Sequence, residues 1–138
     1  EELQPVSLLQ AGLLAALEEL AERTEKRGPL ACRVEDAGWP EELDASVATH
    51  LYRIVQEALN NIIAHAKASQ VVIRLSADDQ LLTLTVTDNG VGLPEGASQA
   101  PGMGLRIMRY RADLIGAELQ IGPAPGKGTT VTCYCGLH

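Results

Sequence analysis

The residues best placed to do chemistry form the stretch Asp88-Asn89-Gly90-Val91-Gly92, which follows an alternating apolar run at residues 82–86. Asp88 has the parity of the apolar residues in that run, so it falls on the face of the predicted strand that should be buried. A buried carboxylate is costly unless a polar group pairs with it. Gly90 and Gly92 permit a sharp turn or the close approach of a ligand. The stretch is therefore either an ordinary turn or the anchor of a ligand.

A second set of polar residues lies on one ridge of a predicted helix at residues 45–66. Glu57, Asn61 and His65 stand at positions i, i+4 and i+8, with no Lys or Arg between them on that ridge. The ridge could be simply solvated, as in most amphipathic helices, or it could carry a carboxylate, an amide and an imidazole to a site. The helix alone leaves both interpretations open.

Several familiar motifs are excluded. The Gly/Pro-rich run at residues 122–128 is one residue too short for a P-loop, and Gly128 stands where that motif needs Ser or Thr. Neither Gly90-Val91-Gly92 nor Gly102-Met103-Gly104 is completed to a dinucleotide-binding fingerprint. No Cys/His spacing typical of a metal site and no nucleophile elbow occurs.

Hydrophobic periodicity predicts the elements that must position these residues. Helices are expected at about residues 10–27, 45–66 and from 102 onwards, and strands at 30–34, 71–75, 81–87, 118–121 and 129–135. Residues 36–44 are expected to be a connecting loop, and residues 89–102 a longer loop of the kind that forms lids. The pattern favours an α+β two-layer sandwich, a mixed sheet with about three helices on one face, in a single domain at residues 1–138.

Composition narrows the function. The 138 residues carry a net charge of −7 and no Phe, which disfavours nucleic-acid binding by a positive field or by aromatic stacking. Cys32, Cys133 and Cys135 are best explained as small core residues in a reducing compartment. No apolar run is long enough to span a membrane and no signal peptide is evident. The abrupt, helix-like beginning suggests a piece of a longer protein.

Four separated segments, in this order and spacing, resemble the N, G1, G2 and G3 boxes of the superfamily of gyrase, heat-shock chaperone ATPases, histidine kinases and MutL. The segments are Glu57 to Asn61, Asp88-x-Gly90-x-Gly92, Gly102-x-Gly104-Leu105 and Gly126-x-Gly128-Thr129. Residues 53–61 and 102–109 are more closely similar to sensor histidine kinases of the nitrate-sensor-like subfamily. The resemblance covers residues 8–135 and implies the Bergerat nucleotide-binding fold.

The resemblance implies a role for each box. Asp88 would accept a hydrogen bond from the exocyclic amine of adenine, and Thr129 would complete that contact through water. Asn61 would bind Mg²⁺, a hard cation that prefers oxygen ligands. Glu57 would orient a magnesium-bound water or assist proton removal as the catalytic residue.

The remaining site residues would surround the sugar and the phosphates of ATP. Gly90 and Gly92 would let the backbone approach the nucleotide, and Gly102 and Gly104, ahead of a helix N-terminus, would present N–H groups to phosphate oxygens. Leu105 and Gly128 complete their boxes. The candidate phosphate ligands are His65, Arg106 and Lys127.

The chain departs from the family pattern in two places. Ala64 replaces the Lys that many relatives carry before the helix histidine, and none of His50, His65 and His138 stands in a phosphoacceptor context. The dimerising helical hairpin that carries the phosphoacceptor histidine is absent, so the chain could bind Mg·ATP but could not phosphorylate itself in cis.

The expected function is that of the ATP-binding catalytic domain of a two-component sensor histidine kinase, a protein-histidine kinase. Its expected partners are the dimerisation domain of the same protein, homodimeric at full length, and a response regulator, with no nucleic acid and no direct membrane contact. The domain would be cytoplasmic, and the full-length protein could be anchored in the inner membrane. The alternatives are an anti-sigma serine kinase and a non-catalytic nucleotide sensor, although the retention of Glu57, Asn61 and Asp88 argues against the second.

Overall fold

The computed structural model describes residues 12–38, 43–92 and 104–136. Its elements are α2 (Leu13–Lys26), β1 (Ala31–Ala37), α3 (Ala45–Asn61), the π-helix η1 (Ile62–Ala66), β2 (Gln70–Ala77), β3 (Leu81–Asp88), α4 (Leu105–Leu114), β4 (Glu118–Pro123) and β5 (Thr129–Gly136). The order of helices and strands agrees with the prediction from periodicity.

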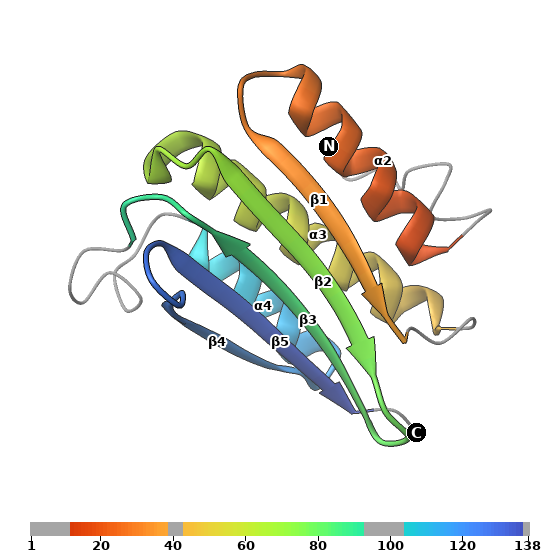
Figure 1. Cartoon of the computed structure of the whole chain (residues 1–138). Coiled ribbons are helices and arrows are strands. Elements are labelled where there is room, and N and C mark those ends of the chain that lie inside the picture. Colours follow the sequence, from red (N-terminus) through yellow and green to blue (C-terminus); the bar gives the residue numbers. More distant parts are fainter. Residues whose placement is uncertain (1–11, 39–42, 93–103, 137–138) are drawn as a thin grey trace.

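The five strands form one mixed sheet in the order β1-β2-β3-β5-β4. Strand β1 pairs with β2 in parallel, and the other neighbours pair antiparallel. The helices α2, α3 and α4 lie together on one face of this sheet (Figure 1). The predicted α+β two-layer sandwich with a mixed sheet is therefore confirmed.

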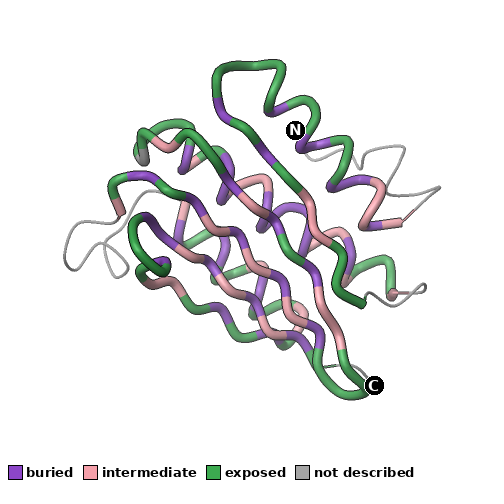
Figure 2. Tube along the Cα trace, in the orientation of Figure 1, coloured by how far each residue is buried: buried purple, intermediate pink, exposed green. Residues whose placement is uncertain are grey.

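The core lies between the two layers and is built mostly from aliphatic side chains, with Tyr52 as its largest fully buried member. Alternate residues of β3 and β5 are buried, as the purple segments of Figure 2 show along both strands. On the helix side, Leu51, Ile54 and Val55 of α3 have 0–1 % exposure. The alternation of β3 does not stop at its last apolar residue, because Asp88 is also buried at 4 % exposure.

The cysteines are part of this core. Cys32, Cys133 and Cys135 are all buried and form no disulfide, in agreement with the sequence analysis. Burial raises the pKa of the Cys32 thiol to about 11 and that of Cys133 to about 12. Both thiols are therefore protonated at neutral pH and behave as small apolar groups.

The long second helix differs from the prediction at its end. It is α-helical only to Asn61, and the next turn, η1, is π-helical. A π-turn holds more residues than an α-turn, which changes the direction of the side chains that follow. Ile63 stands four residues after the buried Leu59, where a continuing α-helix would bury it too, but it is 46 % exposed.

The other differences are at element ends. Strand β1 continues to Ala37, two residues into the predicted loop at 36–44, because its backbone pairs with β2 as far as Ser76. Helix α4 begins at Leu105. Gly102, Met103 and most of the predicted loop at 89–102 lie outside the described residues. No helix in the described ranges is both long and apolar enough to cross a membrane.

Candidate functional site

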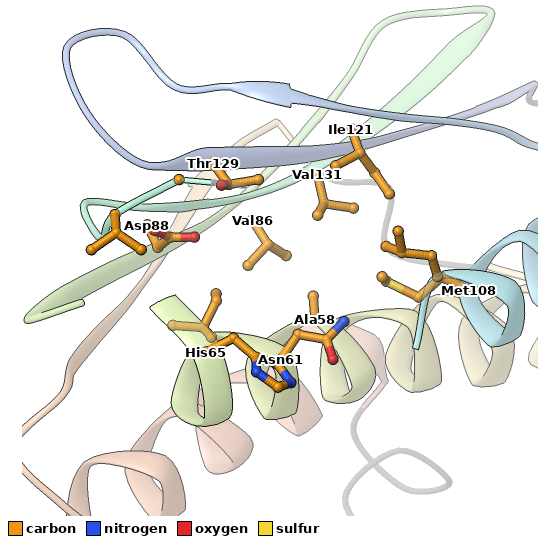
Figure 3. A pocket seen from close by; sticks show the side chains of 13 residues that line it. Ala58, Asn61, His65, Val86, Asp88, Met108, Ile121, Thr129 and Val131 are labelled. Atoms are coloured by element: carbon orange, nitrogen blue, oxygen red, sulfur yellow. The ribbon is translucent and has the colours of Figure 1, made fainter. Parts of the chain in front are cut away.

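One cavity of about 310 Å³ lies between the helix layer and the sheet, at the end where β3 stops (Figure 3). Its lining comes from α3, η1, β3 and the turn after it, α4, β4 and β5. The lining residues are Ala58, Asn61, Ile62, His65, Val86, Asp88, Val91, Gly92, Leu105, Met108, Ile121, Thr129 and Val131.

Most of this lining is apolar. Val86 and Val131 occupy paired positions on β3 and β5 and form the sheet wall, while Met108 reaches the cavity from α4. These residues were not among the predicted site residues. Val86 and Val131 could have been found, because they precede Asp88 and follow Thr129 by two residues and so share their face.

Asp88 is the buried charge of the cavity. Its Oδ1 accepts a hydrogen bond from the backbone N–H of Gly90 at 2.7 Å, and Figure 3 shows a carboxylate oxygen directed into the cavity. Thr129, 9 % exposed, lies close by on β5, one residue beyond the last paired positions Thr87 and Thr130. The cavity therefore has a polar end that combines a carboxylate with a hydroxyl group.

Glycines in the turn after β3 and in the turn before β5 allow the backbones of these two turns to pack directly against each other. Gly128 has a φ of 109°, and a Cβ there would collide with the backbone carbonyl of Asp88. Gly92, with a φ of 82°, would place a Cβ 3.6 Å from the carbonyl oxygen of Gly128. Only glycine adopts these conformations without strain. Gly90 and Gly128 thus hold the frame around Asp88 but do not line the cavity, whereas Gly92 does.

The helix side of the cavity carries Asn61 and His65. Asn61 is half-buried on the last turn of α3 and His65 is exposed on η1, and both are among the side chains that line the cavity (Figure 3). They are separated from Asp88 by the width of the apolar slot. The structure thus brings Asn61, His65, Asp88, Gly92, Leu105 and Thr129 from the predicted site around one cavity.

Glu57 lies elsewhere. Its side chain packs against Gly104, the residue before α4, so closely that a Cβ on Gly104 would overlap the carboxylate. Glu57 and Arg106 both line a neighbouring cavity of about 420 Å³ between α3 and α4. Lys127 is exposed in the turn before β5 and lines neither cavity, and Gly102 lies outside the described residues.

Comparison with known proteins shows which family the chain resembles. Residues 46–138 match the family model described as histidine kinase-, DNA gyrase B- and HSP90-like ATPase. The sensor histidine kinase LiaS of Bacillus subtilis is 37 % identical over 132 residues, which cover 94 % of this chain and 35 % of LiaS. The nitrate/nitrite sensor protein NarX of Escherichia coli is 32 % identical over 126 residues, or 91 % of this chain and 21 % of NarX.

A solved structure is similar in fold. The histidine kinase domain of the blue-light activated histidine kinase EL346 from Erythrobacter litoralis matches with a TM-score of 0.73 at 28 % identity, covering 89 % of this chain and 60 % of that one. The chain spans only about a third or less of the length of LiaS and NarX.

Proposed function

We propose that the 310 Å³ cavity, called the base cavity below, holds the adenine of ATP, because the chain belongs to the family of histidine kinase-, DNA gyrase B- and HSP90-like ATPases. Within that family it is an ATP-binding catalytic domain of the sensor histidine kinase type. The observation that carries this proposal is the buried Asp88 at the end of an otherwise apolar slot. The cavity is at the lower end of the size range of ligand pockets, which suits a planar base.

Asp88 would select adenine by accepting a hydrogen bond from its exocyclic amine. The carboxylate is an acceptor only, and the Gly90 N–H fixes its orientation before the base arrives. The Thr129 hydroxyl, on the neighbouring strand, would complete the contact through a water molecule. The base would lie between the valine pair of the sheet and the helix side chains.

The phosphates would leave the cavity on the side of Asn61 and His65. Asn61 supplies an amide oxygen, a suitable ligand for Mg²⁺. The described residues contain no cluster of three His, Cys, Asp or Glu side chains that could hold a metal ion, so ATP oxygens and water would provide most of the remaining ligands. Mg²⁺, when bound, would neutralise charge on the phosphates. His65 and the N–H groups at the start of α4, near Gly104 and Leu105, are further phosphate contacts.

We also propose a catalytic role for Glu57 that depends on α4. Its carboxylate is now packed against Gly104 rather than facing the base cavity, so it would reach the phosphate side only if the beginning of α4 shifts. In that position it could orient water or assist removal of a proton from the phosphoacceptor. Arg106, on α4, would contact phosphates under the same condition, because it lines the neighbouring cavity and not the base cavity. Lys127 is exposed in the turn before β5, so its contact with a phosphate would depend on that turn and not on α4.

In the whole protein, this domain would transfer the γ-phosphoryl group of ATP to a histidine on a separate dimerisation domain, for relay to a response regulator in the cytoplasm. Its contribution would be positioning and charge neutralisation. Helix α4 offers a surface for that contact, since Ile107, Tyr110 and Leu114 are 49 %, 65 % and 52 % exposed at positions i, i+3 and i+7.

Asp88→Asn tests the adenine assignment. The amide keeps the size of the side chain but presents one acceptor oxygen in place of a carboxylate, so ADP affinity should fall by at least about tenfold, the loss expected for a charged hydrogen bond. Isothermal calorimetry of the wild-type chain with GDP gives the complementary result, because guanine places a carbonyl where adenine has its amine. Circular dichroism should show an unchanged fold. Equal affinity of the variant for ADP, or of the wild type for GDP and ADP, would overturn the assignment.

A further inference from the structure

Asn89, next to Asp88, is exposed and yet makes an unusual number of polar contacts with a single distant segment. Its Oδ1 accepts hydrogen bonds from the backbone N–H groups of Ser69 and Gln70, each at 3.0 Å. Its Nδ2 donates to the Ser69 hydroxyl at 3.0 Å. Its backbone N–H donates to the Gln70 carbonyl at 3.2 Å. All four bonds join the turn after β3 to the beginning of β2.

The segment that Asn89 holds is the direct continuation of the helix wall of the cavity. After η1, Lys67 adopts the left-handed conformation with a φ of 51°, and Ser69 and Gln70 follow after Ala68. The Ser69 carbonyl also accepts the N–H of Ala31, at the beginning of β1. Ser69 is therefore the point at which the helix that carries Asn61 and His65 is connected to the sheet.

We infer that Asn89 is a positioning residue of the nucleotide site. Asn89 does not line the cavity itself. Its hydrogen bonds fix the end of β3, and therefore Asp88, relative to the helix residues on the opposite side of the cavity. The inference rests on the proposed adenine site and deepens it: Asp88 supplies the contact, and Asn89 sets the distance across which that contact is made.

The choice of asparagine follows from this geometry. The Ser69–Gln70 segment presents two backbone donors and one hydroxyl group, and a primary amide on a short stem offers an acceptor and a donor side by side. Alanine would leave both backbone N–H groups without this partner. Aspartate would keep the acceptor, and the Ser69 hydroxyl could reverse its role and donate. Asn89→Asp is therefore the conservative variant, and Asn89→Ala the disruptive one.

The chain contains a matched control at the opposite end of the β2–β3 pair. Asp78 Oδ1 accepts the backbone N–H groups of Gln80 and Leu81 at 2.9 and 2.8 Å. Asp78→Ala thus removes the same number of side-chain to backbone bonds from the same hairpin, but far from the cavity. A general loss of hairpin stability would affect both alanine variants alike.

The experiment measures ADP binding by calorimetry, without magnesium, together with thermal unfolding, for the wild-type chain, Asn89→Ala, Asn89→Asp and Asp78→Ala. About 0.15 M salt screens the exposed charge that Asn89→Asp adds. We expect Asn89→Ala to weaken ADP binding about tenfold, Asn89→Asp to stay within about threefold, and Asp78→Ala to bind as the wild type does, while both alanine variants lower the unfolding temperature.

Two results would overturn the inference: ADP binding by Asn89→Ala that equals the wild type, or an equal loss in Asp78→Ala. Should Asn89→Ala fail to fold, Ser69→Ala replaces it, because this variant removes only the contact with Nδ2 and should weaken ADP binding about threefold. Wild-type strength in that variant would then reject the inference. Failure of the wild-type chain to bind ADP would instead reject the proposed function and the inference with it.

Discussion

Asp88 is the residue on which the proposed site depends, and its surroundings explain how a carboxylate can be kept inside the core. Its backbone pairs with Val71 across the ladder, so the strand carries it onto the buried face. The Gly90 N–H satisfies one oxygen within a two-residue turn. This hydrogen bond fixes the carboxylate through the backbone of its own turn. The turn suggested by the sequence is therefore present, and the proposed ligand anchor is part of it.

Asn61 is predicted to act through magnesium rather than through the base. Asn61→Ala should therefore weaken ATP binding about tenfold with magnesium present and less than about twofold in its absence. Asn60→Ala is the matched control, since Asn60 is the exposed neighbour and does not line the base cavity. Calorimetry measures the ATP affinity of both variants, once with magnesium and once with a chelator. A loss for Asn61→Ala that is the same in the two conditions would show that Asn61 is structural.

The separation of Glu57 from Asn61 shows where residue patterns stop being informative. Their four-residue spacing predicted that both lie on one ridge of a helix, and both do belong to α3. However, Asn61 faces the base cavity and Glu57 faces Gly104, because α4 lies against the ridge between them. Spacing within one helix cannot report where a second helix begins. Asp88 and Thr129 were predictable because strand parity fixes a face on its own.

At the scale of elements, the π-turn η1 decides how the helix wall ends. It extends the helix by one wide turn, exposes Ile63 and directs His65 to the cavity rim. A sequence of Ile, Ile, Ala, His and Ala reads equally well as a continuing α-helix, so periodicity could not predict the change. The extension of β1 was missed for a similar reason. Its last pairs depend on β2, which lies more than 30 residues away in the sequence.

The contact between α3 and α4 should be sensitive to pH. His50 Nδ1 lies 3.3 Å from Arg111 Nη1, and burial, followed by the charge of Arg111, lowers the pKa of His50. With a lowered pKa in the folded state, the unfolded chain takes up the proton first. The stabilising contribution is therefore complete above the ordinary histidine pKa of about 6.5 and is lost as the pH falls through that value towards the lowered one.

Urea unfolding of the ligand-free chain between about pH 7.5 and 5 measures this effect. The stability of the wild type should fall more steeply with acid than that of His50→Gln, whose neutral amide cannot take up a proton. The difference between the two curves isolates His50 from the carboxylates that titrate in both proteins. Parallel curves would mean that the Arg111 contact does not depend on the charge of His50.

The whole molecule brings four remote segments to one end of the sheet. The order β1-β2-β3-β5-β4 places β5 beside β3, so that Thr129 lies near Asp88 (Figure 3), while β4 and α4 close the far side of the slot. Local sequence patterns predicted the helices and strands and several of the polar residues of the candidate site. The sheet order, which puts them together, was available only from the resemblance of the four boxes to a known fold.

The exposed stripe of α4 leads to a prediction about the assembled kinase. Ile107, Tyr110 and Leu114 are directed away from the core, on the helix whose first residues border the base cavity. If the dimerisation domain docks there, Tyr110→Ser should slow phosphorylation of that domain, supplied as a separate polypeptide from the parent protein, by about tenfold. ADP affinity should remain that of the wild type, because the Tyr110 side chain does not line the base cavity.

Leu81→Ser is the control for this experiment, since Leu81 is an exposed apolar residue, at 38 % exposure, on the hairpin at the opposite end of β3. It removes apolar surface without touching α4 and should leave the phosphorylation rate unchanged. Equal rates for Tyr110→Ser and the wild type would exclude α4 as the docking surface. A loss of ADP affinity in Tyr110→Ser would mean that the stripe supports the nucleotide site instead. Only a slower transfer at unchanged affinity separates contact with a partner from binding of the nucleotide, and the position of α4, one end at the cavity and one face in solvent, predicts that outcome.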